Sequence, residues 1–534
     1  MKKMLLFVAA LFSVATVCAQ SDFEFEEPTW TKNLTDVVEK ASDANVNAPV
    51  VITNQGDVIK TGTFNMAFTF AGETLEPIAK SAYVLKYDKE GNEVWGVALQ
   101  GAATITAATA DDEGNIYVAG RFADKVLINS TDGNQVEING VEDMTDQVAG
   151  FVVIYDKAGK MISHREIVPE PDLEMFYSAL ANEAFYTAEA SFMINKIVVE
   201  NDKVYLSASY KGGITLDEVS LKGKVLNYFD YMFIDLNGFA AICLDKELAN
   251  AELLADVHTA ESVLYGGLQI QPEAMKFDVD GDDVYVVWTG WGELTMETKK
   301  GSENFSFAVE GEAQEHGYVV ANVTKGETAV FHAPATDKIA SFFTITDAQV
   351  VEDKFYVSGT FIGSLAFDNS KTSTGACDAF LASIHTADLT LDWAQNSGIN
   401  EGEENKYNEV ALGLDANDFG VATMVNTIDM NSKEISQTTV FGYVPMTGQN
   451  VILDVPFVIT ANSISVAGSV FNTNIGTEST LRYFADEDFT QGIETIDNSQ
   501  SSISNDAIYN LQGQRVNKAQ KGVFIQNGKK VVVK

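Results

Sequence analysis

The fold is decided by one stretch of sequence, DEGNIYVAGRF at residues 112–122. In it, a polar turn leads into a run of β-forming residues that ends in a small residue and an aromatic one. Six further copies follow the same pattern. They are NQGDVIKTGTF at 54–64, ENDKVYLSASY at 200–210, DGDDVYVVWTG at 280–290, VEDKFYVSGTF at 351–361, and the weaker ANDFGVATMV at 416–425 and ANSISVAGSVF at 461–471. Such a repeat indicates an array of similar structural units.

Each copy is followed by a second buried strand and often by a third. Examples are AYVLKYDKEG from Ala82 and then EVWGVALQ from Glu93. With the strand before the turn, every unit holds four antiparallel strands. The sequence therefore predicts an all-β fold, a seven-bladed β-propeller of four-stranded antiparallel blades over residues 20–492. Closing the ring buries both faces of each sheet and leaves few open edges.

The ring needs a closing strand, because the seventh copy is followed by a polar stretch at 486–491. Near the N-terminus, PTWTKNL at 28–34 carries Trp30, which resembles Trp95 and Trp393 in the predicted fourth strands of other units. We expect this segment to complete the last blade. The alternative is an unattached N-terminal arm.

The first 19 residues have the form of a signal peptide. Lys2 and Lys3 precede an apolar run, and Ala19 supplies the small residue expected before a cleavage site. Lipidation at Cys18 is the alternative, but Val17 stands where a small residue is expected. No later stretch reaches 18 unbroken apolar residues, so we expect no transmembrane span.

The C-terminal end differs in composition from the repeats. Residues 493–506 form a polar linker, and 507–534 (AIYNLQGQRVNKAQKGVFIQNGKKVVVK) predict a small β module with turns at 512–513 and 527–528. This tail resembles the C-terminal sorting domain of type IX secretion in Bacteroidetes. The resemblance implies the secretion machinery as a partner and a secreted, extracellular or cell-surface location. The location would be periplasmic if the tail does not act in sorting.

The repeats resemble a bacterial β-propeller repeat of the form D-x-x-G-N-x-Y-x-x-G-x-F that occurs in many surface proteins. Residues 112–122 match the pattern, whereas the copies near Glu200, Ala416 and Ala461 have diverged from it. This resemblance implies the fold and not an activity.

Charge and cysteine content exclude several function classes. With 76 acidic against 35 basic residues, the surface repels phosphate backbones, so no nucleic-acid partner is expected. Solubility outside the cell accounts for this charge, and a cationic partner is the alternative. No CxxC, HxH or HExxH motif occurs, so we expect no metal site and no cofactor. The acidic run at 278–283 is similar to a calcium loop, but it lacks a suitably placed bidentate glutamate.

Candidate ligand-binding residues come from aligning the inner strands on the turn. Lys196, Lys276 and Asp347 then share one column, and Glu409 falls one pleat earlier. Because inner strands line the central channel, these charges could converge on a ligand, and a polar channel wall is the alternative. Two aromatic residues, Trp288 and Trp291, could stack on a sugar or peptide, whereas local repacking is the alternative reading of Trp288.

Two function classes remain. The first is a non-catalytic binding or scaffold propeller with a glycan or peptide ligand. The second is a propeller hydrolase or lyase in which channel carboxylates act as acid and base. We favour the first and assign no catalytic residue, because no catalytic motif occurs in a fitting context. Close pairing of Asp347 with Glu409 would favour the enzyme. The sequence indicates neither the ligand nor the oligomeric state.

Overall fold

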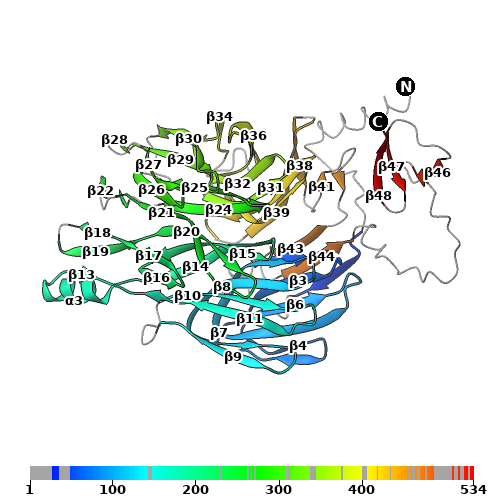
Figure 1. Ribbon diagram of the computed structural model, residues 1–534, viewed down its shortest axis with the longest axis horizontal. Helices are drawn as coiled ribbons and strands as arrows, with labels where there is room; N and C mark the ends of the chain where they lie inside the picture. The colour runs from blue at the N-terminus through cyan, green and yellow to red at the C-terminus, as the bar shows by residue number, and fades with distance from the viewer. Residues whose placement is uncertain are drawn as a thin grey trace. The chain divides into compact units, whose positions relative to one another are not determined.

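The computed structural model describes residues 27–34, 48–141 and 147–485, together with four strands of the tail. The gaps within these ranges are 229, 261–263, 266–267, 270–271, 291, 308, 311–312, 337–343, 375–376, 400–405, 418, 433–434, 447, 454–457, 460–463, 466–468 and 476–477. The chain divides into two compact units, Met1–Phe489 and Thr490–Lys534. Within the described residues the fold is all-β apart from a single helix, α3 (Leu173–Ala181) (Figure 1).

The first sheet of the larger unit contains two four-stranded groups joined by one long strand. Its order is β11–β10–β8–β7–β6–β3–β2, and β9 pairs with β8. The first half of the 18-residue strand β7 pairs with β6 and the second half with β8, so β7 ends one group and begins the next. The strands are β2 (Val50–Ile52), β3 (Val58–Phe64), β6 (Ser81–Tyr87), β7 (Glu93–Ala110), β8 (Ile116–Asn129), β9 (Gln135–Asn139), β10 (Ala149–Tyr155) and β11 (Met161–Ile167).

The following sheets repeat the antiparallel four-stranded group. One contains β14 (Ser191–Glu200), β15 (Lys203–Lys211), β20 (Gly238–Asp245) and β21 (Glu252–Thr259), extended by β26 (Gly292–Thr298) and β27 (Gly301–Phe307). The next contains β24 (Pro272–Asp280), β25 (Asp283–Gly290), β29 (Ala313–Asn322) and β30 (Glu327–Thr336), with β28 (Val309–Glu310) beside β29. Two more contain β31 (Thr344–Val351), β32 (Lys354–Phe361), β35 (Asp378–His385) and β36 (Leu391–Asn396), and then β37 (Lys406–Asn417), β38 (Gly420–Asp429), β39 (Ile435–Val444) and β40 (Gln449–Leu453).

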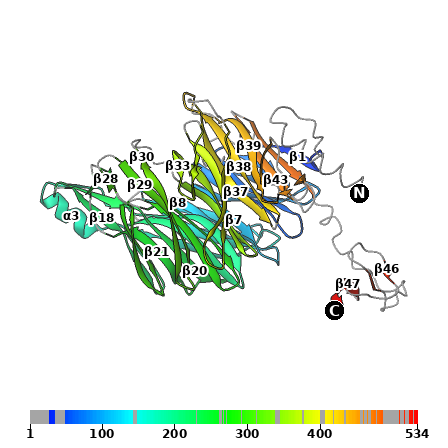
Figure 2. The same cartoon turned by 90° about the horizontal axis from the view of Figure 1, so that it is seen from above.

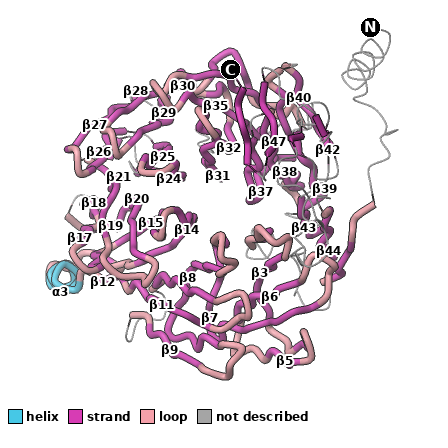
Figure 3. Tube along the Cα trace, turned by 45° about the vertical axis from the view of Figure 1, so that its right-hand side comes forward, coloured by secondary structure: helices cyan, strands magenta, loops and turns pink. Residues whose placement is uncertain are grey.

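The sheets are arranged around a common centre. The first strands of successive groups contact one another in chain order, β7 with β14, then β24, β31 and β37. Figure 3 shows β14, β24, β31 and β37 nearest the middle of the ring. Both faces of a sheet are buried: on β15, Val204 and Leu206 belong to the core on one side and Tyr205 to the core on the other. Radial sheets with cores between them are the arrangement of a β-propeller.

The ring is closed by strands from both ends of the unit. Strand β1 (Trp30–Asn33) pairs with β44 (Glu478–Phe484), which pairs with β43 (Ser469–Ile475), and β43 contacts β2. The predicted pairing of residues 28–34 with the last repeat is therefore confirmed for β1. The short strands β41 (Val458–Ile459) and β42 (Ile464–Ser465) pair with each other, and residues 466–468 between them and β43 lie outside the described part of the chain.

Trp30 occupies the same environment as Trp95. Its indole N–H donates to the Lys89 carbonyl at 3.2 Å, and its ring lies against the turn glycine Gly91. Trp95 likewise donates to the Lys157 carbonyl at 3.1 Å and lies against the turn glycine of the next group. β1 is thus equivalent to the fourth strand of the other groups.

The turn that marks the repeat is organised by an aspartate one residue before the quoted stretch. The Asp111 carboxylate accepts the backbone N–H groups of Glu113 and Asn115, at 3.0 and 2.8 Å, and the Asn115 side-chain amide. Gly114 adopts φ +83, which disfavours a residue with a side chain. The D of the repeat is therefore Asp111 rather than Asp112, and the side chain hydrogen-bonds its own turn.

Insertions connect the main strands (Figure 2). Helix α3 contacts β13 (Phe185–Tyr186), which pairs with β19 (Met232–Leu236), and β19 pairs with β18 (Lys224–Tyr228). The other short strands are β4 (Phe68–Phe70), β5 (Glu73–Leu75), β12 (Pro169–Glu170), β16 (Gly213–Leu216), β17 (Val219–Lys222), β22 (Leu264–Tyr265), β23 (Leu268–Gln269), β33 (Ser364–Leu365) and β34 (Asp368–Thr372).

The smaller unit is a four-stranded antiparallel sheet in the order β46–β45–β47–β48. Its strands are β45 (Ile508–Tyr509), β46 (Arg515–Val516), β47 (Gly522–Gln526) and β48 (Lys529–Val533). Strands β47 and β48 flank the predicted turn at 527–528. In the described part of both units, no helix is long and apolar enough to cross a membrane.

Candidate functional site at the centre of the ring

Three of the predicted site residues meet at the centre of the ring. Lys196 lies on β14, Lys276 on β24 and Asp347 on β31. The strand register shifts just before two of them, between Ile194 and Lys196 and between Ile345 and Asp347. A bulge of this kind re-aims the side chain that follows it.

The central contact is an ion pair between strands that are not neighbours in the ring. Lys196 Nζ lies 2.6 Å from Asp347 Oδ1 and also donates to the backbone carbonyl of Ala348. The two side chains are 17% and 20% exposed, so the pair is largely shielded from solvent. The pair joins β14 to β31 although β24 lies between them in the ring.

Asp347 has further partners. Its Oδ1 accepts the Ala348 N–H at 2.8 Å, and its Oδ2 accepts the Leu414 N–H of β37 at 3.1 Å. Both carboxylate oxygens are therefore engaged. An aspartate in this state acts as an acceptor that connects strands, because each of its oxygens already accepts a hydrogen bond from the protein.

Two further side chains connect the inner strands. Lys276 Nζ donates to the Asn195 carbonyl of β14 at 2.7 Å. Asp278, also on β24, accepts the Val350 N–H of β31 at 2.7 Å. The inner strands belong to separate sheets, so these side chains supply hydrogen bonds that no sheet ladder provides.

Burial and mutual attraction set the charges of this network. Burial would lower the pKa of Lys196, but the carboxylates of Asp347 and Asp278 outweigh it and raise that pKa. Burial opposes ionisation of Asp347, yet Lys196 and Lys276 hold its pKa below the usual value. Desolvation lowers the pKa of Lys276 to about 8 and raises the pKa of Asp278. Two lysines thus face two aspartates, and the favoured state of Lys196 and Asp347 is a fixed ion pair.

A low aspartate pKa has a chemical consequence. A general acid must hold a proton near neutral pH, and a general base must reach a substrate proton. Asp347 is kept ionised, and both of its oxygens already accept hydrogen bonds from the protein. The geometry therefore fits a structural connection better than acid–base catalysis.

The remaining predicted residues do not extend this site. Trp288 is fully buried and packs edge-on against Phe305, with ring centroids 5.1 Å apart, so it is a core residue, and its burial favours the local-repacking alternative over ligand stacking. Trp291 and the side chain of Glu409 lie outside the described part of the structure; the Glu409 backbone pairs with Asn426 on β38. Pairing of Asp347 with Glu409 thus stays untested.

Sequence reasoning missed Asp278 as a member of the network. The sequence groups it with the acidic run 278–283, whereas the structure places it within β24, two residues from Lys276. Side chains two residues apart on a strand share a face, so the spacing of Lys276 and Asp278 indicates that both side chains lie on the same face of the strand.

Comparison with known proteins gives only distant structural likenesses. No family model matches the sequence, and no curated protein matches it. The WD40 domain of SCAP from fission yeast is 10% identical, with a TM-score of 0.30, covering 87% of this chain and 99% of that domain. The β-propeller domain of the Trilobed protease from Pyrococcus furiosus is 8% identical, with a TM-score of 0.26, covering 76% and 97%. A mutant NanB sialidase from Streptococcus pneumoniae is 10% identical, with a TM-score of 0.27, covering 82% and 71%.

Proposed function

We propose that this chain is a non-catalytic binding or scaffold protein, built as a seven-bladed propeller and displayed outside the cell. One observation supports the non-catalytic role. Two of the charged groups at the centre of the ring, where a propeller enzyme would hold its acid and base, bind each other: Lys196 contacts Asp347, and Asp347 also accepts the Leu414 N–H. The hydrolase alternative requires free carboxylates there.

The repeat and the sheet order together support the proposed count of seven blades. Six four-stranded groups begin at β2, β7, β14, β24, β31 and β37. The seventh copy of the motif then accounts for β41 to β44, with β1 as its fourth strand. The seven copies of the repeat predict the same number of blades, and the pairing of β1 supports it.

Export is proposed from the two ends of the chain. Residues 1–19 would direct secretion and be removed. The four-stranded β unit at the C-terminus would present the sorting signal to the type IX secretion machinery. The acidic composition fits display in the extracellular medium. If the tail does not act in sorting, we expect the protein to be located in the periplasm.

Turnover and binding distinguish the two functions. The chain lacking residues 1–19 is incubated with panels of polysaccharides and peptides, and the same panels are screened for binding. We expect binding of a glycan or peptide without turnover. Asp347→Asn should then weaken the fold and leave ligand specificity unchanged. Turnover that Asp347→Asn abolishes, without unfolding, would establish the hydrolase instead.

Export has its own test. Full-length protein and a version lacking residues 507–534 are expressed in a bacterium with type IX secretion, and cell fractions are compared. We expect the full-length chain at the surface or in the medium and the shortened chain in the periplasm. Equal distribution of the two would contradict a sorting role for the tail.

A further inference from the structure

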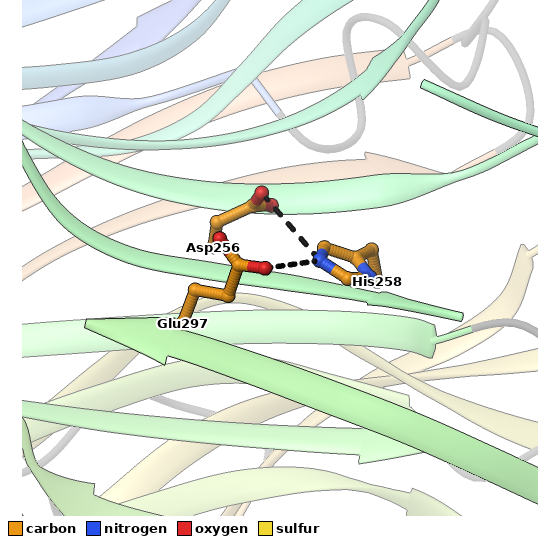
Figure 4. A group of neighbouring side chains, drawn as sticks. All are labelled: Asp256, His258 and Glu297. Atoms are coloured by element: carbon orange, nitrogen blue, oxygen red, sulfur yellow. Dashed lines mark hydrogen bonds and ion pairs between the residues drawn. The ribbon is translucent and has the colours of Figure 1, made fainter. Parts of the chain in front are cut away.

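A second cluster of chemically active side chains lies away from the centre of the ring. Asp256 and His258 are two residues apart on β21, and Glu297 lies on β26 directly opposite Asp256 (Figure 4). Residues two apart on a strand share a face, and so do directly opposed residues on paired strands. The three side chains therefore gather on one face of the sheet.

The residues of the cluster come from two segments that pair in one sheet, although strands of the next sheet lie between them in the chain. Strands β26 and β27 lie between β25 and β29 in the chain, but they pair onto the outer edge of the preceding sheet beside β21. Glu297 is brought to His258 by this cross-over. A bound ion here would fasten the inserted hairpin to that edge.

The distances suit a single small cation. His258 Nε2 lies 3.3 Å from Glu297 Oε1 and 4.0 Å from Asp256 Oδ2, and one ligand atom from each residue lies within 4.8 Å of the others. Ligand atoms around a tetrahedral zinc ion are about 3.3 Å apart, as its bond lengths require. A small inward movement of Asp256 would complete the arrangement.

The surrounding hydrogen bonds fix which atoms face the centre. His258 Nδ1 lies 3.0 Å from the Thr259 carbonyl oxygen, which can only accept, so Nδ1 carries the proton and donates it. The Tyr210 hydroxyl donates to Asp256 Oδ1 at 2.7 Å. These are the contacts that orient metal-binding histidines and carboxylates. They leave His258 Nε2, Asp256 Oδ2 and Glu297 Oε1 directed at one another.

Three facing acceptors require a positive charge between them. Asp256 and His258 are each 6% exposed, so water is largely kept from them. A metal ion at the centre would supply that charge. Imidazole nitrogen and carboxylate oxygen are both zinc ligands, and a zinc ion that keeps an open position has three protein ligands, whereas calcium and magnesium require more oxygen ligands.

We propose that Asp256, His258 and Glu297 bind a divalent transition-metal ion, best matched by Zn²⁺. The Glu297 side chain is 54% exposed, so the site opens to solvent on that side and leaves a coordination position for water. The site is independent of the function proposed for the centre of the ring. Its ion connects β21 to β26.

The test measures zinc binding by competition with a chromophoric chelator, on metal-stripped chain lacking residues 1–19. Wild type is compared with Glu297→Gln, His258→Gln and the control Glu303→Gln. Glu303 lies on β27 directly opposite Met296, whose side chain belongs to the core. Met296 and Glu303 therefore share the face of the sheet that is opposite to the cluster. Glu303→Gln makes the same charge change as Glu297→Gln but outside the cluster. Co²⁺ absorption spectra of the same proteins report the ligand geometry.

We expect wild type and Glu303→Gln to bind one more equivalent of Zn²⁺ than His258→Gln does. Glu297→Gln should weaken binding at least tenfold. Zinc should raise the melting temperature of wild type and of the control but not that of His258→Gln. Equal zinc binding by all four proteins would overturn the proposal. So would no binding of Zn²⁺ by wild type at pH 7.5. If His258→Gln does not fold, the partly exposed Glu297→Gln decides alone.

Discussion

Replacing Trp30 with alanine tests the closure of the ring. Trp30 is 9% exposed, and its ring centroid lies 5.3 Å from that of Tyr483 and 5.5 Å from that of Tyr87. Truncating a buried tryptophan costs about 3–5 kcal/mol. Loss of its hydrogen bond to the Lys89 carbonyl adds about 1 kcal/mol. We therefore expect Trp30→Ala to lower the free energy of unfolding by roughly 4–6 kcal/mol.

The assay is urea unfolding followed by circular dichroism, combined with limited proteolysis under native conditions. Trp95→Ala is the matched control, because Trp95 makes the same kind of hydrogen bond but lies within a continuous sheet. Both variants should be destabilised, but only Trp30→Ala should expose residues 28–34 to protease. A change below about 1 kcal/mol for Trp30→Ala, with the segment still protected, would refute the reasoning.

Three other predictions concern single residues. Lys60 is 2% exposed, and desolvation lowers its pKa to about 7. Lys60→Met should therefore raise the free energy of unfolding at pH 7 by on the order of 3 kcal/mol. An unchanged urea midpoint would contradict this prediction. A lysine whose pKa is lowered in the folded state binds fewer protons when folded than when unfolded. Wild type should therefore gain stability relative to Lys276→Met as pH rises from about 8 to 10.5. Parallel stability profiles of the two proteins against pH would contradict this prediction. Asp111→Ala should cost about 1–2 kcal/mol by thermal unfolding, and Asp112→Ala less than about 0.5 kcal/mol; equal effects would show that Asp111 does not organise the turn.

The repeat made most of the architecture predictable. The same turn pattern, followed by a run of β-forming residues, recurs so regularly that the inner strands can be aligned on it. That register placed Lys196, Lys276 and Asp347 in one column, and the structure brings them together. The pairing of Trp30 with the last repeat was also predictable, since a tryptophan in the fourth strand is itself part of the pattern.

Insertions and partners across the ring could not be predicted in the same way. Glu297 belongs to a hairpin that leaves its own sheet to pair with β21, and periodicity along a single strand does not reveal such a cross-over. The D-x-H spacing of Asp256 and His258 was visible, but its third ligand was not. Trp288 departs from the repeat because the same hairpin supplies Phe305 and Phe307 against it, so the large residue fills space that the inserted strands create.

The central claim is that the charged groups in the middle of the ring hold the inner strands together. A double-mutant cycle on Lys196 and Asp347 measures this directly, using the unfolding free energies of wild type, Lys196→Met, Asp347→Asn and the double variant. For a pair that is only about one-fifth exposed, we predict a coupling energy of about 1–3 kcal/mol, so that the double variant loses less stability than the two single losses add up to. A coupling energy near zero would contradict the account, because the two side chains would then be independent groups on a channel wall.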